Sequence, residues 1–346
     1  MRPPDAPISV IVPIHNRADL AEQCLVALGR WTTPLEILVV DDGSSDPGVE
    51  PLRRAGLAHH WLRNEEAKGF SAAVNRGLAC ATGDPLLLLN SDAEVTEGGD
   101  HAIRAAFATP AGHPGSPAAV GAVAARLVYP NGRPQWSGGS FPSLLWLFAL
   151  ASGLGRGARF RLRHLRSTPA SGFAGGLVDW APGAALAIGR EAFAAVGPFD
   201  ESYRHYAQDL DYCQRLATSG RSVRVLADWV VAHHLGGSVE SLAEPADRRP
   251  EPSSTNAAGP TGSTDSTGST GSDTAARYDG QRIDLLWLDL LHWADRHRSP
   301  AWARQARRRL LLGGRLRLLR LATRRHGRDS AEARAVAAAI AAIRHA

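Results

Sequence analysis

The sequence is poor in sulfur and holds a single lysine. Three cysteines, Cys24, Cys80 and Cys213, occur among 346 residues. Their wide spacing excludes a disulfide framework and a zinc cluster, so we expect small, buried apolar side chains at these positions. The one lysine, Lys68, does not belong to a Gly-x-x-x-x-Gly-Lys phosphate loop, and ATP hydrolysis is therefore not indicated.

Long apolar runs are missing as well. The longest clean one covers residues 144–150, which falls far short of the roughly 20 residues that span a bilayer. The first residues show no basic segment followed by an apolar stretch, so no secretory signal is expected. These two absences predict a cytoplasmic protein without a transmembrane helix.

The formal charge of +5 is concentrated near the C-terminus, because residues 282–346 hold fifteen arginines and five acids. Basic helices often bind nucleic acid, but leucines and tryptophans accompany these arginines, so nucleic acid is not the expected partner. Arginines beside an apolar face favour peripheral contact with the inner face of an anionic membrane. A helix pair packed on the rest of the protein is the alternative.

Short apolar runs alternate with helix-period segments from residue 8 to about residue 128. Strands are predicted at residues 8–12, 36–40 and 85–89. Apolar positions at helical spacing predict two helices between them, through Leu20, Cys24, Leu28 and Trp31, and through Phe70, Ala73, Val74 and Leu78. Successive βαβ units of this kind predict an α/β fold, Rossmann-like, with a mostly parallel central sheet flanked by helices.

Composition divides the rest of the chain. Residues 1–240 read as one α/β domain, and residues 241–280, rich in Ser, Thr, Gly and Pro, as a low-complexity disordered linker. Residues 281–346 form a basic amphipathic helical extension, which we expect to be interrupted at Gly313-Gly314. A last helix is predicted to begin at Ser330, a favourable N-cap.

Polar loops follow three of the predicted strands, and ligands collect at the carboxyl ends of parallel strands because the loops converge there. The loops are Pro13-Ile14-His15-Asn16-Arg17, Asp41-Asp42-Gly43-Ser44-Ser45-Asp46 and Asn90-Ser91-Asp92. Each loop alone is an ordinary turn sequence. Their coincidence at equivalent strand ends predicts a shared crevice.

From about residue 8 to residue 238 the sequence resembles glycosyltransferase family 2, and more narrowly its rhamnosyltransferase-like branch. Besides the loops above, the resemblance rests on these blocks: Gly69-Phe70-Ser71-Ala72-Ala73-Val74-Asn75-Arg76-Gly77, Gly197-Pro198-Phe199-Asp200-Glu201, Gln208-Asp209-Leu210-Asp211 and His233-His234-Leu235-Gly236-Gly237-Ser238. It implies the GT-A fold and an enzyme that moves a sugar from a nucleotide-diphosphate sugar to an acceptor hydroxyl.

The resemblance also implies a divalent cation, Mn²⁺ or Mg²⁺, which stabilises the charge of the leaving nucleoside diphosphate. Asp92 corresponds to the metal-binding acid, and His233, five residues before Ser238, fits the family pattern better than His234. Asp42 would contact the nucleotide base, while Asp41 holds the turn. Further donor contacts are implied for these residues: Pro13, Asn16, Gly69, Asn75, Asn90, Ser91 and Asp92.

Asp209 matches the family's catalytic base, which takes the proton of the acceptor hydroxyl. The family has a glutamate before this aspartate, where the present sequence has Gln208, and a neutral amide cannot supply a second negative charge. The donor-sugar and acceptor side is expected to include Trp180, Gly183, Gln208 and Asp211. Core packing is the alternative for Trp180, and favourable charge at a helix N-terminus is the alternative for Asp209 and Asp211.

The resulting hypothesis is an inverting, metal-dependent transferase that acts on a glycan or lipid-linked acceptor in cell-surface polysaccharide or glycolipid synthesis. Only the branch resemblance points to rhamnose. The departure at Gln208 motivates an alternative, a catalytically silent nucleotide-sugar binding or scaffold subunit. A sugar-phosphate nucleotidyltransferase is less favoured, because residues 13–17 lack a Gly-rich basic loop. Residues 134–171 match the family poorly and are interpreted as an acceptor-facing or membrane-facing insertion.

Overall fold

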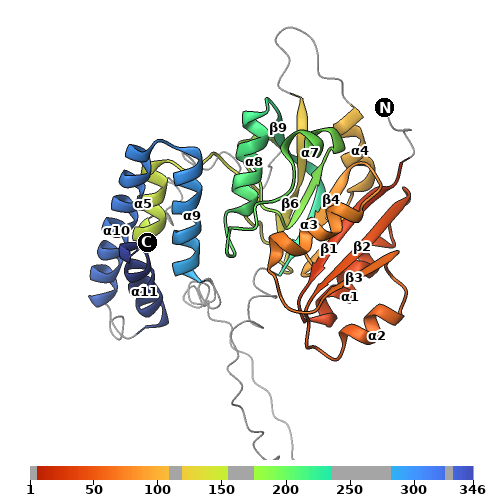
Figure 1. Cartoon of the computed structure of the whole chain (residues 1–346), viewed down its shortest axis with the longest axis horizontal. Coiled ribbons are helices and arrows are strands. Elements are labelled where there is room, and N and C mark those ends of the chain that lie inside the picture. Colours follow the sequence, from red (N-terminus) through yellow and green to blue (C-terminus); the bar gives the residue numbers. More distant parts are fainter. Residues whose placement is uncertain (1–5, 109–118, 155–174, 235–281, 324–329, 346) are drawn as a thin grey trace, which may run out of the picture.

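The computed structural model describes residues 6–108, 119–154, 175–234, 282–323 and 330–345. One mixed sheet with helices on both faces forms the larger part, and a group of helices lies beside it (Figure 1). The C-terminus belongs to that helical group, which also receives one helix, α5, from the middle of the sequence.

Nine strands form a single sheet in the order β3-β2-β1-β4-β8-β6-β9-β5, and β7 pairs with β9. The strands are β1 (Ile8–Ile14), β2 (Leu35–Asp42), β3 (His60–Asn64), β4 (Leu86–Leu89), β5 (Ala93–Glu97), β6 (Val120–Val128), β7 (Gly176–Val178), β8 (Ala185–Ile188) and β9 (Ser222–His233). β1 to β4 pair in parallel with one another, whereas β8 is antiparallel to both β4 and β6. The expected α/β fold is therefore present, with a parallel first half and a mixed second half.

Helices connect these strands and continue beyond them. They are α1 (Ala18–Leu28), α2 (Val49–Arg54), α3 (Phe70–Cys80), α4 (Asp100–Ala108), α5 (Leu144–Ser152), α7 (Arg190–Val196), α8 (Gln208–Thr218), α9 (Ile283–His297), α10 (Pro300–Ala322) and α11 (Ala331–His345). The strands and helices that the apolar pattern predicts between residues 8 and 89 are found, although α1 ends at Leu28 and does not reach Trp31. None of the helices within the described ranges is long and apolar enough to span a bilayer.

The side-chain alternation of β1 explains the layers of the domain. Ile8, Val10, Val12 and Ile14 belong to an apolar cluster with α1 and α4, while Ile11 belongs to a second cluster with α3, α7 and α8. Successive side chains of a strand point to opposite faces, so one buried strand anchors helices on both sides of the sheet. The carboxyl ends of β1, β2 and β4 are left to the loops.

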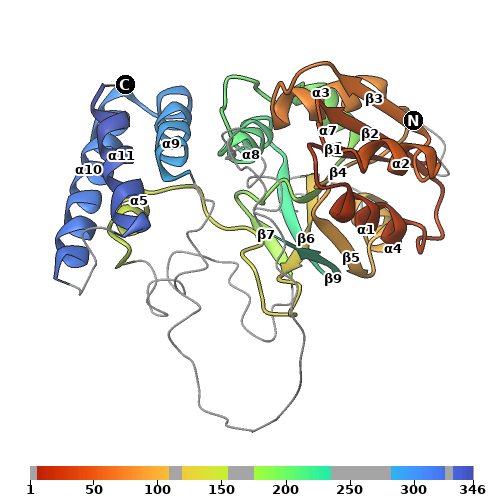
Figure 2. The same cartoon turned by 90° about the horizontal axis from the view of Figure 1, so that it is seen from below.

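The helical group consists of α5, α9, α10 and α11, and its core is continuous with the apolar cluster under α8. Figure 2 shows α5 lying against α10 although it comes from the middle of the chain. Ser299 Oγ accepts a hydrogen bond from the N–H of Trp302 at the start of α10. At the predicted start of α11, Ser330 Oγ accepts one from the N–H of Ala333, as its N-cap role requires.

Two expectations are wrong in detail. α10 runs through Gly313-Gly314 without interruption, because both glycines allow close helix packing. A Cβ on Gly313 would lie 2.8 Å from the carbonyl oxygen of Phe148 in α5, and one on Gly314 would lie 2.7 Å from the ring of Trp287. Cys24 and Cys213 are buried as predicted, but Cys80 is exposed. The predicted linker, residues 241–280, lies outside the described residues.

Candidate active site

The loops after β1 and β2 are joined through Asn16. Its side-chain Oδ1 accepts hydrogen bonds from the N–H groups of Ser45 and Asp46 at 2.8 and 3.0 Å, and its own N–H donates to Ser44 Oγ at 2.8 Å. Asn16 and Arg17 both have left-handed backbone conformations, with φ of 58° and 51°. Such strain costs free energy and persists where surrounding contacts hold it, as these hydrogen bonds do.

Asp41 and Asp42 take separate roles at the end of β2. Asp41 is buried, and its Oδ1 accepts a hydrogen bond from the N–H of Ser44, so it holds the turn as expected. Asp42 is also buried and accepts hydrogen bonds from the N–H groups of Lys68 and Gly69 and from Asn64 Nδ2, at 2.7 to 3.0 Å. Its carboxylate thus fixes the start of α3, where Gly69 has φ 93°.

Asp92 and His233 come together through strand pairing. Ala93 of β5 pairs with His233 of β9, which places the His233 Nε2 atom 3.3 Å from Asp92 Oδ1. The two residues are 3% and 6% exposed. Asn90 approaches the same imidazole, with its Nδ2 atom 3.5 Å from Nε2. The family-implied metal residues are therefore adjacent, although 141 positions separate them in the sequence (233 minus 92).

Gln135, which the sequence did not single out, orients the His233 ring. Its Nε2 donates to the backbone carbonyl of His233 at 3.0 Å, and its Oε1 lies 2.8 Å from His233 Nδ1. A carbonyl oxygen can only accept, so this orientation assigns the amide oxygen to Nδ1, which must then carry the ring proton. In the neutral imidazole, this network leaves His233 Nε2 with a lone pair that faces Asp92.

This donor set suits a divalent cation. A carboxylate oxygen and an unprotonated imidazole nitrogen are both electron-pair donors, and a positive ion between them would relieve their mutual repulsion. A histidine that binds a metal usually makes a hydrogen bond through its other ring nitrogen, which fixes the ring orientation. The contact between Gln135 and His233 Nδ1 is of this kind. Across the ranges that the structure describes, no group of three His, Cys, Asp or Glu residues is placed so that it could hold a metal ion.

Asp209 lies in the first turn of α8 and is half-buried. Its Oδ2 accepts a hydrogen bond from the N–H of Gly183 at 3.1 Å. Burial raises the pKa of the Asp209 carboxyl, although the N–H groups of Gly183 and Leu210 partly oppose this effect. A carboxyl whose pKa is raised accepts a proton more readily than an ordinary aspartate, which suits a general base. The side-chain oxygen of the neighbouring Gln208 is buried and has no hydrogen-bond partner.

Short contacts connect Asp209 with the other loops. The N–H of Asn90 donates to the carbonyl of Ala184 at 2.9 Å, next to the Gly183 that holds Asp209. On the other side, a Cβ built on Gly183 would lie 3.7 Å from the ring of Phe70, which follows Gly69 at the start of α3. The segment at residues 183–184 thus joins Asp209, the Asp92–His233 pair and the loop held by Asp42. Ser91, between Asn90 and Asp92, is buried in the same turn.

Asn75 and Asp211 lie elsewhere than expected. The Asn75 amide donates to the carbonyl of Phe199 and accepts from its N–H, so it holds the segment before α8 instead of lining the crevice. Asp211 is fully buried, and its carboxylate accepts hydrogen bonds from the side chains of Tyr203, His297 and Arg215. Its expected place on the acceptor side was wrong, because positions two apart on a helix point in different directions.

Trp180 and Pro13 are mainly packing residues. The Trp180 ring is 9% exposed, contacts Trp136 edge-on at 4.8 Å between ring centroids, and donates its indole N–H to the carbonyl of Ser140. The core alternative for Trp180 is therefore the observed one. Pro13 pairs with Val40 in the parallel ladder of β1 and β2, one residue before the strand ends.

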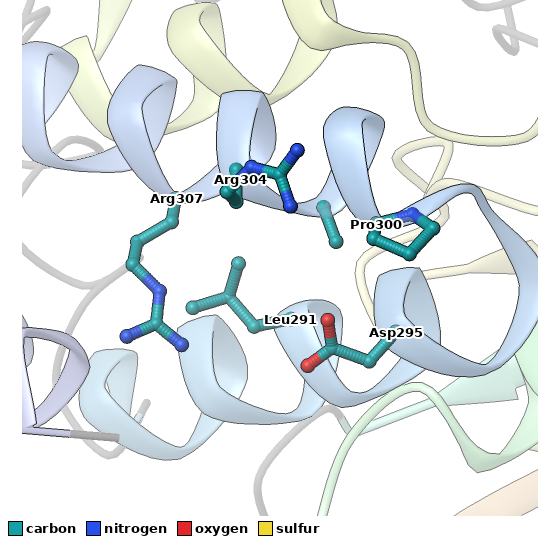
Figure 3. A pocket seen from close by; sticks show the side chains of 6 residues that line it. Leu291, Asp295, Pro300, Arg304 and Arg307 are labelled. Atoms are coloured by element: carbon teal, nitrogen blue, oxygen red, sulfur yellow. The ribbon is translucent and has the colours of Figure 1, made fainter.

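A separate pocket lies between α9 and α10 in the helical group. Its lining includes Leu291 and Asp295 from α9 and Pro300, Arg304 and Arg307 from α10 (Figure 3). None of these residues belongs to the loops at the strand ends. The pocket is therefore distinct from the candidate active site.

Together, the mixed sheet, the acids at its strand ends and the Asp92–His233 pair define an α/β domain of the GT-A type. Residues 9–111 match the model of glycosyl transferase family 2. The chain is 30% identical over 243 residues to the pre-mycofactocin glycosyltransferase of Mycobacterium tuberculosis, an alignment that covers 67% of this chain and 44% of that protein. The chain belongs to glycosyltransferase family 2.

Solved structures agree on the fold. A mannosyltransferase from Pyrobaculum calidifontis, in complex with GDP-Man and Mn²⁺, aligns over 98% of this chain and 85% of its own, with a TM-score of 0.50 and 17% identity. GalNAc-T7 with UDP, GalNAc and Mn²⁺ aligns over 66% of this chain and 44% of its own, with a TM-score of 0.50 and 19% identity. The chain spans less than half the length of the mycobacterial relative.

Proposed function

We propose that this protein is an inverting, metal-dependent glycosyltransferase that uses a nucleotide-diphosphate sugar. The observation that carries the proposal is the placement of Asp209, whose carboxylate is held by Gly183 at the segment that also bonds the loop of Asp92. A proton acceptor and a pair of cation ligands on one rim match the two needs of glycosyl transfer, activation of the acceptor and stabilisation of the leaving group.

Asp209 acts as the general base in this proposal. Its carboxylate takes the proton from the acceptor hydroxyl while the oxygen forms a bond to the anomeric carbon and the bond from that carbon to the phosphate oxygen breaks. Attack opposite the leaving group inverts the anomeric configuration. The hydrogen bond from Gly183 holds the carboxylate in place, and the raised pKa of Asp209 favours its protonation during the step.

Asp92 and His233 would hold the divalent cation, and Gln135 keeps the imidazole in the required tautomer. Bound there, the ion would supply positive charge to the diphosphate of the donor. Asp42 and Asn16 shape the opposite end of the crevice, where we place the nucleotide base. These assignments rest on the hydrogen bonds within the protein.

The donor is proposed to be a uridine or thymidine diphosphate sugar, with rhamnose favoured only by the sequence resemblance. Structures with the same fold contain UDP or GDP-mannose together with Mn²⁺, which supports a nucleotide sugar and Mn²⁺ or Mg²⁺ as the general classes. A glycan or a lipid-linked molecule in polysaccharide or glycolipid synthesis is the proposed acceptor.

Contact with an anionic membrane would bring a lipid-linked acceptor to the enzyme. α10 contains no acidic residue, and one of its faces exposes Arg308, Leu312, Arg315 and Leu319. α10 lies on the side of the helical group away from the sheet (Figures 1 and 2). We expect sedimentation with phosphatidylglycerol vesicles at low salt, and Arg308→Glu with Arg315→Glu should abolish it. Equal recovery in the supernatant with and without vesicles would contradict membrane contact.

The decisive experiment measures nucleoside diphosphate release from a panel of nucleotide sugars in the presence of Mn²⁺ and candidate acceptors. Turnover that stops with EDTA and returns with Mn²⁺ supports the proposal. Binding of UDP with Mn²⁺ but no turnover for any pair would instead support a silent nucleotide-sugar binding subunit. If neither binding nor turnover occurs, both the transferase and the silent binding subunit are rejected.

A further inference from the structure

Asp289 of α9 binds the backbone just before the catalytic helix. Its carboxylate is fully buried and accepts hydrogen bonds from three consecutive backbone N–H groups, those of Arg204, His205 and Tyr206, at 3.2, 3.0 and 2.8 Å. A buried carboxylate is costly unless donors surround it, and three amides that converge on one group also fix their own geometry. The contact therefore determines the path of residues 204–206.

That path leads directly into the helix of the base. Ala207 follows with φ 61°, a left-handed conformation that is unfavourable for alanine, and its carbonyl accepts the first hydrogen bond of α8, from the N–H of Asp211. Asp209 is the second residue of that helix. The strained turn at Ala207 sets the direction of α8, and Asp289 holds the three amides that precede the turn.

Other residues on α9 reinforce the same docking. His292 Nε2 lies 2.8 Å from Ser202 Oγ, Arg296 pairs with Asp200 at 2.9 Å, and His297 pairs with Asp211 at 2.7 Å. Positions 289, 292 and 296 share one face of a helix, so this face of α9 packs along the segment from residue 200 to residue 211. Figure 1 shows α8 between the sheet and α9.

We propose that the C-terminal helices form part of the catalytic unit and that Asp289 is the positioning residue through which they set Asp209. The inference rests on the proposed function, since it assigns a partner to the base. Asp289 acts through the backbone N–H groups of residues 204–206, and its carboxylate also pairs with the Arg204 guanidinium at 3.8 Å. Helices α9 to α11 are then required for turnover even though all residues assigned to the donor precede them in the sequence.

The test compares Asp289→Asn with Asp295→Asn, an exposed aspartate of the same helix that faces the separate pocket (Figure 3). We expect Asp289→Asn to lower kcat roughly 10- to 100-fold, because small displacements of a reacting group have effects of this size. The Kd for UDP with Mn²⁺ should stay within about twofold, because Asp92, His233 and Asp42 are untouched. Asp295→Asn should behave like the wild type.

Rescue separates positioning from a general loss of folding. Glycine adopts positive φ without strain, so Ala207→Gly in the Asp289→Asn background should recover part of the lost kcat. His292→Ala, which weakens the docking of α9 but leaves the three amides bound, should lower Tm with little change in kcat. Equal losses of kcat in the His292→Ala and Asp289→Asn variants, without rescue by glycine, would overturn the positioning role.

Amide hydrogen exchange keeps this inference distinguishable from the proposed function. The peptide that spans residues 203–210 should exchange faster in Asp289→Asn than in Asp295→Asn, whether or not any donor is turned over. Unchanged exchange in that peptide would overturn the inference even for an active enzyme. Faster exchange in a protein that never releases a nucleoside diphosphate would uphold the anchoring and reject the transferase.

Discussion

The two faces of α8 carry chemically identical side chains in opposite environments. Asp209 faces Gly183 and the strand ends, and within the described part of the chain no cationic side chain hydrogen-bonds its carboxylate. Asp211, two positions later, is surrounded by Tyr203, His297 and Arg215. One face meets Gly183 next to the strand-end loops, and the other joins the domain to the C-terminal helices.

The difference appears in the protonation of the two carboxyls. Burial raises the pKa of Asp209, since only backbone N–H groups oppose it. Burial also acts on Asp211, but the hydrogen bond from His297 and the charge of Arg215 outweigh it and lower the pKa of that carboxyl. A neighbouring cation therefore decides whether a buried aspartate favours its protonated form or its ionised form. Four predictions distinguish a residue proposed to react, Asp209, from residues that stabilise the fold or orient another side chain.

The largest effect is expected for Asp209→Asn. The amide cannot accept a proton, so kcat should fall about 10²- to 10⁴-fold. The Kd of UDP with Mn²⁺ and the Tm should stay close to those of the wild type. Steady-state kinetics together with calorimetric binding would check both expectations. A variant that retains most of its kcat would remove Asp209 from the mechanism.

Asp211→Asn should have the opposite consequence: a large loss of stability instead of a specific loss of kcat. Loss of the buried charge leaves Arg215 without its counter-ion and weakens the hydrogen bond with His297, which should cost about 3 kcal/mol of unfolding free energy. Nucleotide affinity should persist wherever the variant is folded. Urea denaturation measures the loss, and Glu22→Gln, an exposed acid on α1, provides the control. Equal stability of the two variants would show that the ion pairs on this face contribute little.

Gln135→Leu tests whether a residue outside the metal pair holds its geometry. Without the amide, His233 is free to change ring orientation and tautomer, so the Kd for Mn²⁺ should rise about 10- to 100-fold. Titration calorimetry with Mn²⁺ measures this effect. Nitrogen-15 shifts of the His233 ring should show the proton on Nδ1 in the wild type only. An unchanged Mn²⁺ affinity would exclude this role for Gln135.

The smallest effect is a shift in pH dependence. Asp209 must be ionised to accept a proton, and its pKa is raised above the ordinary value of 3.8, so activity should be lost on acidification at a pH above 3.8. Asp211 acts in the opposite sense, because its lowered pKa contributes stability that is lost only as pH falls below 3.8. The dependence of kcat on pH, measured with saturating Mn²⁺ and donor, is compared with an acid unfolding curve. If activity and folded structure are lost at the same pH, unfolding causes the loss of activity.

The first half of the domain was predictable because its signals are local. The apolar strand of residues 8–12 and the helical spacing of Phe70, Ala73, Val74 and Leu78 correspond to β1 and α3. Parallel pairing then brings Asn16 to the turn after Asp42, as expected for adjacent strand ends. Asp92 and His233 were predicted from the family resemblance, and their adjacency comes from the pairing of β5 with β9.

The second half depends on contacts that no local pattern reveals. Gln135 and Asp289 are single polar residues in ordinary surroundings, and nothing in their neighbours signals a partner 98 or 83 to 85 positions away. The predicted interruption of the helix at Gly313-Gly314 was wrong because it, too, depends on distant contacts. Glycine lowers helix propensity, but close packing against α5 and Trp287 outweighs that cost.

The sequence by itself determined the α/β class, the acids at the strand ends and the presence of C-terminal helices, because hydrophobic periodicity and turn chemistry act over short distances. Only the tertiary structure decided which of Asp209 and Asp211 lies beside Gly183, how Gln135 orients the His233 ring, and what anchors the start of α8. Those properties depend on burial and on partners brought in by strand pairing and helix docking. The free energy of a buried charge is set by whatever surrounds it in space.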